Sequence, residues 1–168
     1  MEQITNFKER ILSGIIAGAL SYSSLIGKQI IVKSPSFKKR DEYILRFFPR
    51  NFLHLTGVLT NLSSMDFYVK ALDGSLSLSD FDCDSTPALK GTVRCKVHNL
   101  QNIGTFFQRV VKVEEEFSSG KVRCKFATSE ATYTLGFVGT SFLVPNTLLN
   151  KDKIGEAKRV NDFVIIVE

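Results

Sequence analysis

Hydrophobic positions recur at intervals of three and four near the beginning of the chain, which predicts a helix over residues 4–24. Gly27 ends this pattern. Within it, Gly14 and Gly18 have a spacing that lets a neighbouring element approach closely, and we expect that neighbour to be a sheet. The apolar run from Ile11 to Leu20 is too short to span a membrane, so the helix is predicted to belong to the core.

Three β-rich runs follow this helix. Residues 29–32 form a short run, and residues 43–48 alternate imperfectly as a strand. Pro49 interrupts the alternation, which resumes over residues 52–58. The last two runs therefore predict one bent strand, or a strand and a turn.

Two further helices are indicated by their capping residues. Ser63 or Ser64 caps a helix over residues 65–72, and Asp73-Gly74 stops it. Ser85-Thr86-Pro87 begins another helix, which we expect to end at Gly104.

From Arg109 the period changes to two, which predicts a hairpin whose loop is Phe117–Gly120. Three cross-strand pairs then follow: Glu116 with Lys121, Glu114 with Arg123, and Val113 with Cys124.

The remaining runs, over residues 131–138, 142–149 and 160–167, also read as strands. Helices collected before a run of strands predict a single α+β domain over residues 1–168. Its sheet is antiparallel, with helices on one face and the other face open.

His54 and Thr56 are the first candidate catalytic residues. On a strand they would lie two apart on one face, side by side. Histidine suits proton transfer because it can gain or lose a proton near neutral pH, and a hydroxyl can orient it or a phosphate oxygen. The alternative is that His54 is a structural strand-end histidine and Thr56 an ordinary strand residue.

The surrounding residues resemble a known family. Asn51-Phe52, His54-Leu55-Thr56-Gly57, Gly136-Phe137 and Leu143-Val144-Pro145 recur in this order in the phage-associated barnase, EndoU, colicin and RelE-like nucleases, fourth type. The similarity spans most of residues 4–168, and its sharpest part is the His54 motif. It implies a compact fold of helices followed by a sheet, similar to barnase and RelE, that cleaves RNA without a metal ion.

Charge adds a second group of candidates. The chain has a formal net charge of +5, and residues 33–50 hold six basic residues against two acidic ones, a local net charge of +4. Such a segment is suited to holding phosphates near His54, and Arg46 and Arg50 are the expected phosphate clamps. The alternative is a solvated surface loop.

The predicted open face of the sheet supplies further candidates. Lys125, Thr132 and Thr134 are expected to contact the substrate. Lys125 is favoured over Arg123 because the predicted register places it opposite Lys112, which leaves positive potential without a counter-charge. The alternative is that all of them are solvated strand residues.

Together these features predict a metal-independent endoribonuclease, toxin-like or a phage or mobile-element effector, that cleaves RNA by 2′-hydroxyl attack. The alternative is a catalytically inactive binding module with the nuclease fold, such as a phage protein that inhibits a host component. RNA is the expected partner, with a cognate inhibitor or host protein as a second one, and no membrane or cofactor is expected. The three cysteines have neither zinc-site nor disulfide spacing, which favours a reducing, cytoplasmic setting and no metal.

Overall fold

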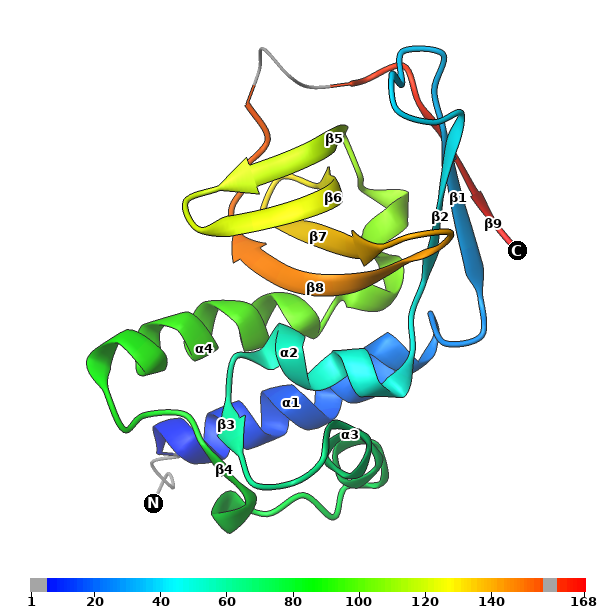
Figure 1. The fold of residues 1–168 in the computed structure, drawn as a ribbon. Coiled ribbons are helices and arrows are strands. Elements are labelled where there is room, and N and C mark those ends of the chain that lie inside the picture. Colours follow the sequence, from blue (N-terminus) through cyan, green and yellow to red (C-terminus); the bar gives the residue numbers. More distant parts are fainter. Residues whose placement is uncertain (1–5, 156–159) are drawn as a thin grey trace.

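The computed structural model describes residues 6–155 and 160–168 (Figure 1). Helices dominate the first part of the chain and strands the second. In chain order the elements are α1 (Phe7–Ser23), β1 (Gln29–Lys33), β2 (Glu42–Arg46), the 3-10 helix η1 (Pro49–Asn51), α2 (Phe52–Thr56), β3 (Leu59–Thr60), α3 (Ser64–Asp73), η2 (Leu78–Asp80), β4 (Phe81–Asp82), α4 (Pro87–Leu100), η3 (Ile103–Gln108), β5 (Lys112–Ser119), β6 (Val122–Ser129), β7 (Tyr133–Gly139), β8 (Leu143–Asn150) and β9 (Val164–Val167).

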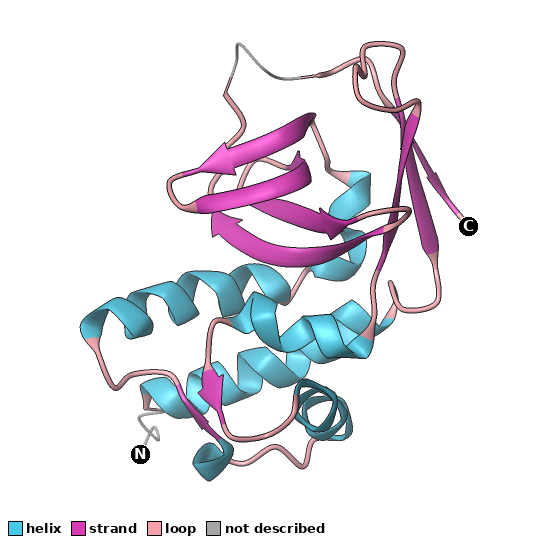
Figure 2. Ribbon diagram, viewed as in Figure 1, coloured by secondary structure: helices cyan, strands magenta, loops and turns pink. Residues whose placement is uncertain are grey.

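The α-helices gather on one side of a seven-stranded sheet (Figure 2). The strand order is β5-β6-β7-β8-β2-β1-β9, and every pair is antiparallel except β2 with β8. The predicted α+β class is therefore confirmed. The sheet also carries a second, smaller apolar cluster apart from the main core, in which Phe117, Cys124, Ala127 and Ile154 are buried.

The capping residues located two of the helices correctly. The Ser63 hydroxyl accepts a hydrogen bond from the Asp66 amide at 3.0 Å, and α3 ends at the left-handed Gly74. Thr86 caps α4 in the same way. The end of α4 was predicted wrongly, because the helix stops at Leu100 and the chain then tightens into η3. The first helix is confirmed over its described part, and residues 4 and 5 lie outside the described residues.

Gly14 and Gly18 face α4, which corrects the prediction that they face the sheet. A Cβ atom at Gly14 would lie 2.6 Å from Val97 Cγ1, and one at Gly18 would lie 3.2 Å from the Leu100 Cβ atom. Only glycine therefore lets α1 and α4 pack this closely. The contact fixes the position of α4 beneath the sheet.

The β5–β6 hairpin forms as predicted, but its register is wrong. Ser118 pairs with Arg123 where Glu114 was expected, a displacement of four residues. The loop consists only of Gly120 and Lys121, because Phe117 is buried opposite Cys124 and stays in the ladder instead of entering the loop.

The other predicted cross-strand pairs are wrong for the same reason. Val113 pairs with Thr128 instead of Cys124, and Lys112 pairs with Ser129 instead of Lys125. Lys112 also forms an ion pair with Asp152 at 2.6 Å. The repulsion that favoured Lys125 as a phosphate contact is therefore absent.

Candidate active site

The segment that contains His54 is helical, so the prediction of a strand over residues 52–58 is wrong. Pro49 begins η1, α2 continues directly from it, and the left-handed Gly57 ends α2 at a φ of 75°. Phe52 and Leu55, three residues apart, are both fully buried. In a run this short the apolar residues fit a helix or a strand, and tertiary packing decides between them.

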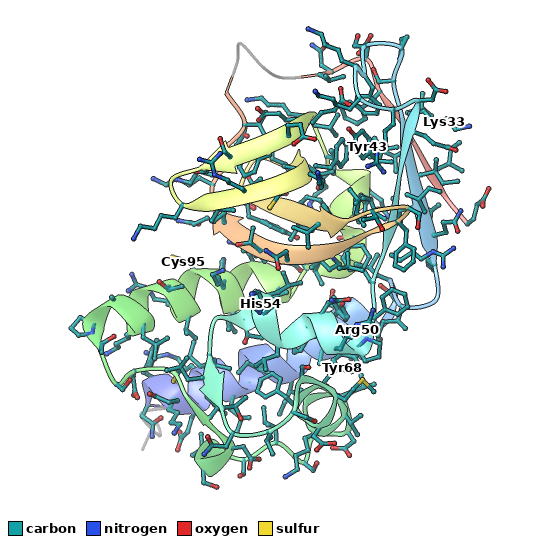
Figure 3. The ribbon with its side chains drawn as sticks, in the orientation of Figure 1. Lys33, Tyr43, Arg50, His54, Tyr68 and Cys95 are labelled. Carbon is teal, nitrogen blue, oxygen red and sulfur yellow. The ribbon has the colours of Figure 1, made fainter. Side chains whose placement is uncertain are left out.

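Phe52 anchors α2 in an aromatic cluster. Its ring centroid lies 5.3 Å from those of both Tyr22 and Tyr68 and 6.2 Å from that of Phe67. The Tyr22 hydroxyl donates a hydrogen bond to the Phe48 carbonyl at 2.7 Å, which ties α1 to the start of the same segment. With one side of α2 held by these contacts, His54 projects from the other side into solvent (Figure 3).

Thr56 does not accompany His54. Residues two apart on a helix point in different directions, and the Thr56 side chain is fully buried. Its hydroxyl donates to the Leu53 carbonyl at 2.7 Å and accepts from the Val58 amide at 3.2 Å. These bonds close the C-terminal turn of α2, so we assign Thr56 a structural place and leave it out of the proposed site.

His54 lines a cleft of about 450 Å³ between the helices and the sheet. The helices contribute His54 and Lys96, whereas the β5–β6 hairpin and β8 contribute the opposite wall. The residues on that wall are Lys121, Val122, Arg123, Asn146 and Thr147. One imidazole therefore shares a polar cleft with three cationic side chains.

No acidic side chain of the described residues neutralises the positive charge in this cleft. No carboxylate lines it among the described residues, and within residues 6–155 and 160–168 neither Lys96, Lys121 nor Arg123 forms an ion pair. Such a cleft attracts an anion, because unpaired cations raise the local concentration of negatively charged ligands.

Lys96 differs from the other two cations because it is partly buried. Burial lowers its pKa, since removing water from an ammonium group disfavours the charged form. A lowered pKa makes the uncharged, proton-accepting form of a lysine easier to reach, which is how general-base lysines are tuned. Gly57 lies against it: a Cβ atom there would lie 3.0 Å from Lys96 Cδ.

Arg46 and Arg50 lie outside the cleft lining, but the structure brings them together around one aromatic pair. The Arg46 guanidinium lies 5.0 Å from the ring centroid of Phe142, and that of Arg50 lies 4.5 Å from the ring centroid of Phe48. The two rings are 6.0 Å apart. Arg50 is also four residues before His54 along one continuous helical segment.

The other basic residues before the histidine lie far from it. The loop after β1 sits at the opposite end of the β1–β2 pair from α2, close to the labelled Lys33 (Figure 3). Glu115 holds this loop in place, because its carboxylate accepts hydrogen bonds from the Lys38 and Lys39 amides. Arg40 donates to the Thr140 carbonyl. The prediction that the basic segment holds phosphates near His54 is therefore wrong for these loop residues.

The three candidates on the sheet are dispersed. Lys125 is exposed on β6, two residues beyond Arg123, and does not line the cleft. Thr134 is fully buried, and its hydroxyl donates to the Lys151 carbonyl at 2.9 Å, so it is not on an open polar face. Thr132 is exposed in the β6–β7 turn, where its hydroxyl donates to the Glu130 carboxylate, and it borders a different cavity.

A comparison with protein families agrees with the resemblance found in the sequence. The sequence model of the family described as phage-Barnase-EndoU-ColicinE5/D-RelE like nuclease4 matches residues 15–168. The chain belongs to this family. The region matched to this nuclease family therefore includes all of β1–β9, α2–α4 and most of α1. No curated protein and no solved structure matches the chain at a significant level.

Two further observations concern the described residues of this nuclease-family chain. Among the described residues, no group of three or more His, Cys, Asp or Glu side chains is arranged to hold a metal ion. Over the same residues, no helix combines the length and apolar character needed to cross a membrane.

Several cleft residues have little or no signal in the amino-acid sequence. Lys96 follows the buried Val93 by three residues and precedes the buried Val97, so its position at the edge of the apolar stripe of α4 was the available signal. Lys121 became part of the cleft only through the two-residue turn. Asn146 and Thr147 carry no local signal, because their place depends on how β8 packs over α2 and α4.

Proposed function

We propose that this nuclease is a metal-independent endoribonuclease that cleaves RNA by attack of the 2′-hydroxyl on the adjacent phosphate. The observation that supports this most directly is the cleft in which His54 shares space with Lys96, Lys121 and Arg123. Cleavage of this kind needs a base, an acid and positive charge around the phosphate. The cleft contains side chains suited to all three tasks.

In the proposed reaction, His54 and Lys96 are the proton-transfer pair. Lys96, whose pKa is lowered by burial, takes the proton from the 2′-hydroxyl in its uncharged form. The 2′-oxygen then bonds to phosphorus, and the bond from phosphorus to the departing 5′-oxygen breaks. His54 gives its proton to that 5′-oxygen, while Lys121 and Arg123 stabilise the negative charge on the phosphate oxygens.

Arg46 and Arg50 are proposed to contact the RNA strand beyond the cleft. Each guanidinium is held against an aromatic ring, so less side-chain freedom is lost when a phosphate binds. The neighbouring helical segment carries His54, so a strand bound at the two arginines lies close to the cleft. Lys125, exposed beside Arg123 on β6, is a further candidate phosphate contact.

The proposal is tested with purified protein and labelled single-stranded RNA, in excess EDTA and without it. We expect cleavage in both conditions and products that end in a cyclic or 3′-phosphate, whereas DNA of the same sequence stays intact because it lacks the 2′-hydroxyl. Loss of cleavage in EDTA would overturn metal independence. Binding without any cleavage would favour the alternative of an inactive binding module, with a host component or cognate inhibitor as its partner.

A salt titration tests whether Lys121 and Arg123, the cations on the opposite wall of the cleft, contact RNA phosphates. RNA affinity should fall as salt rises, with a log–log slope of about −0.7 for each contacted phosphate. The double variant Lys121→Ala/Arg123→Ala should make this slope shallower by the amount that corresponds to about one to two contacted phosphates. Lys70→Ala is the matched control, because Lys70 lies on α3 in an ion pair with Asp80, away from the cleft. An equal change in both variants would contradict the proposed RNA position.

Replacing Lys96 separates function from stability. Lys96→Met keeps the apolar stem but removes an ammonium group whose pKa is lowered by burial. A lysine whose pKa is lowered in the folded protein destabilises the fold at every pH below its unfolded pKa, because the unfolded chain holds the proton more tightly, so the variant should raise the melting temperature at neutral pH. RNA cleavage should fall about a hundredfold or more. A more stable variant with full activity would exclude Lys96 as the base.

A further inference from the structure

A second polar cavity, of about 530 Å³, lies where α4 and η3 meet the β6–β7 turn. It contains none of the residues of the His54 cleft. Neutral hydrogen-bonding side chains predominate among its lining residues, which are His98, Asn99, Asn102, Arg109, Glu130, Thr132, Tyr133 and Asn150.

Two of these side chains make no hydrogen bond within the described residues, and the hydroxyl of one of them is fully buried. The Tyr133 hydroxyl is enclosed, and it makes no hydrogen bond within the described parts of the chain. Asn99 is 8% exposed, and none of the side-chain hydrogen bonds among residues 6–155 and 160–168 involves its amide. Burying a polar group without a partner is costly, so such groups in a cavity indicate a ligand or water that satisfies them.

The charged residues of the cavity neutralise each other. The Arg109 Nε atom donates to Glu130 Oε2 at 3.0 Å. Its terminal nitrogens donate to the carbonyls of Thr105 and Asn102. With the guanidinium committed on all three nitrogens, the cavity offers little to a phosphate and is suited to an uncharged, polar ligand.

We infer that this cavity binds a nucleobase. An asparagine amide offers a donor and an acceptor side by side, the pattern that pairs with the edge of a base, and three asparagines line the cavity. The exposed His98 imidazole provides a flat surface for base stacking. Tyr133 also lines the cavity, and its hydroxyl has no hydrogen-bonding partner among the described residues.

The position of the cavity favours a base of the RNA itself, and in this respect the inference rests on the proposed function. α4 contributes Lys96 to the His54 cleft and Asn99 to this cavity, and β8 contributes Asn146 and Asn150 in the same way. At the usual rise per residue these separations are about 4.5 Å on the helix and about 13 Å on the strand. One short strand of RNA can therefore occupy both.

The test is a titration of the intact protein with adenosine, guanosine, cytidine and uridine, monitored by the NMR signals of the asparagine side-chain amides. At least one nucleoside should shift the signals of Asn99 and Asn150, and ribose 5-phosphate, which lacks a base, should not. Binding does not require cleavage, so the result stands even if the proposed function fails. Absence of a shift with all four nucleosides would overturn the inference.

Two variants of cavity residues and one control variant identify the site. Tyr133→Phe removes only the hydroxyl and should weaken nucleoside binding about fivefold to tenfold, the loss of one hydrogen bond. Thr128→Val is the control, because the Thr128 hydroxyl is also buried without a partner but does not line the cavity. Asn150→Ala changes an exposed residue and tests the cavity without disturbing the core. Unchanged binding in both Tyr133→Phe and Asn150→Ala would overturn the inference.

Cleavage of RNAs that differ in one base identifies the source of the ligand. If the cavity holds a base of the substrate, the preferred base should match the best-binding nucleoside, and Tyr133→Phe should reduce the preference through KM. Nucleoside binding without any such preference would also support a base site, but one occupied by a free nucleoside.

Discussion

Replacing His54 with alanine is expected to reduce the rate of RNA cleavage by about two or more orders of magnitude, because a positioned acid or base contributes roughly that much. The side chain is exposed and makes no hydrogen bond to any other residue in the described chain. Its loss should therefore change the free energy of unfolding by less than about 0.5 kcal/mol. Single-turnover cleavage at saturating RNA and a thermal melt measure the two effects separately.

His54→Gln serves as the matched variant, because glutamine keeps hydrogen-bonding groups but cannot carry the proton. It should bind RNA with nearly normal affinity and cleave it as poorly as the alanine variant. Cleavage at the rate of the unmodified protein in either variant would exclude His54 from proton transfer. An unfolded His54→Ala protein would favour the structural alternative for this histidine.

The largest effect on stability is expected from Phe52→Ala. The ring is fully buried among Tyr22, Phe67 and Tyr68, and deleting a ring from such a site costs about 3 to 5 kcal/mol. For a chain of this size that corresponds to a decrease of roughly 6 to 20 °C in melting temperature. Denaturant unfolding provides the free energy directly.

Phe52→Leu keeps most of the apolar volume and is the control for this change, with an expected cost below about 1.5 kcal/mol. Because α2 is held in place by this ring, Phe52→Ala should also reduce cleavage at temperatures where the protein is still folded. A loss of less than 1 kcal/mol, about the smallest effect that a buried ring could have, would contradict the anchoring of α2 by Phe52.

The helices were predictable because their signals are local. Ser63, Thr86 and Pro87 mark helix starts through bonds and dihedral angles within one turn, and the structure places them as expected. The segment of His54 was misassigned because α2 spans only five residues, too few for a period of 3.6 to be distinguished from a period of 2. The buried cluster around Phe52 decides its conformation, and that cluster depends on residues far away in the sequence.

The candidate site was predictable only in its central residue. His54 was identified from its motif, whereas Lys96, Lys121 and Asn146 join it through the packing of α4, the turn of the hairpin and the position of β8. The register error of four residues had a physical origin as well: the pairing of opposite charges in the prediction is weak, and the burial of Phe117 outweighs it. Long-range packing therefore determines the register of the hairpin and the residues of the cleft, and charge patterns in the sequence could not predict either.

The cleft is assembled from residues that span positions 54 to 147, and its two walls belong to different layers of the fold. While the protein is being synthesised, His54 and Lys96 leave the ribosome well before the strand that carries Asn146 and Thr147. A nascent chain therefore lacks Asn146 and Thr147, the part of the opposite wall that lies nearest α2 and α4 in the sheet order, until β8 is available to pack over these helices. If the cleft cleaves RNA, this order of assembly keeps the enzyme inactive beside its own messenger RNA until most of the chain has been made.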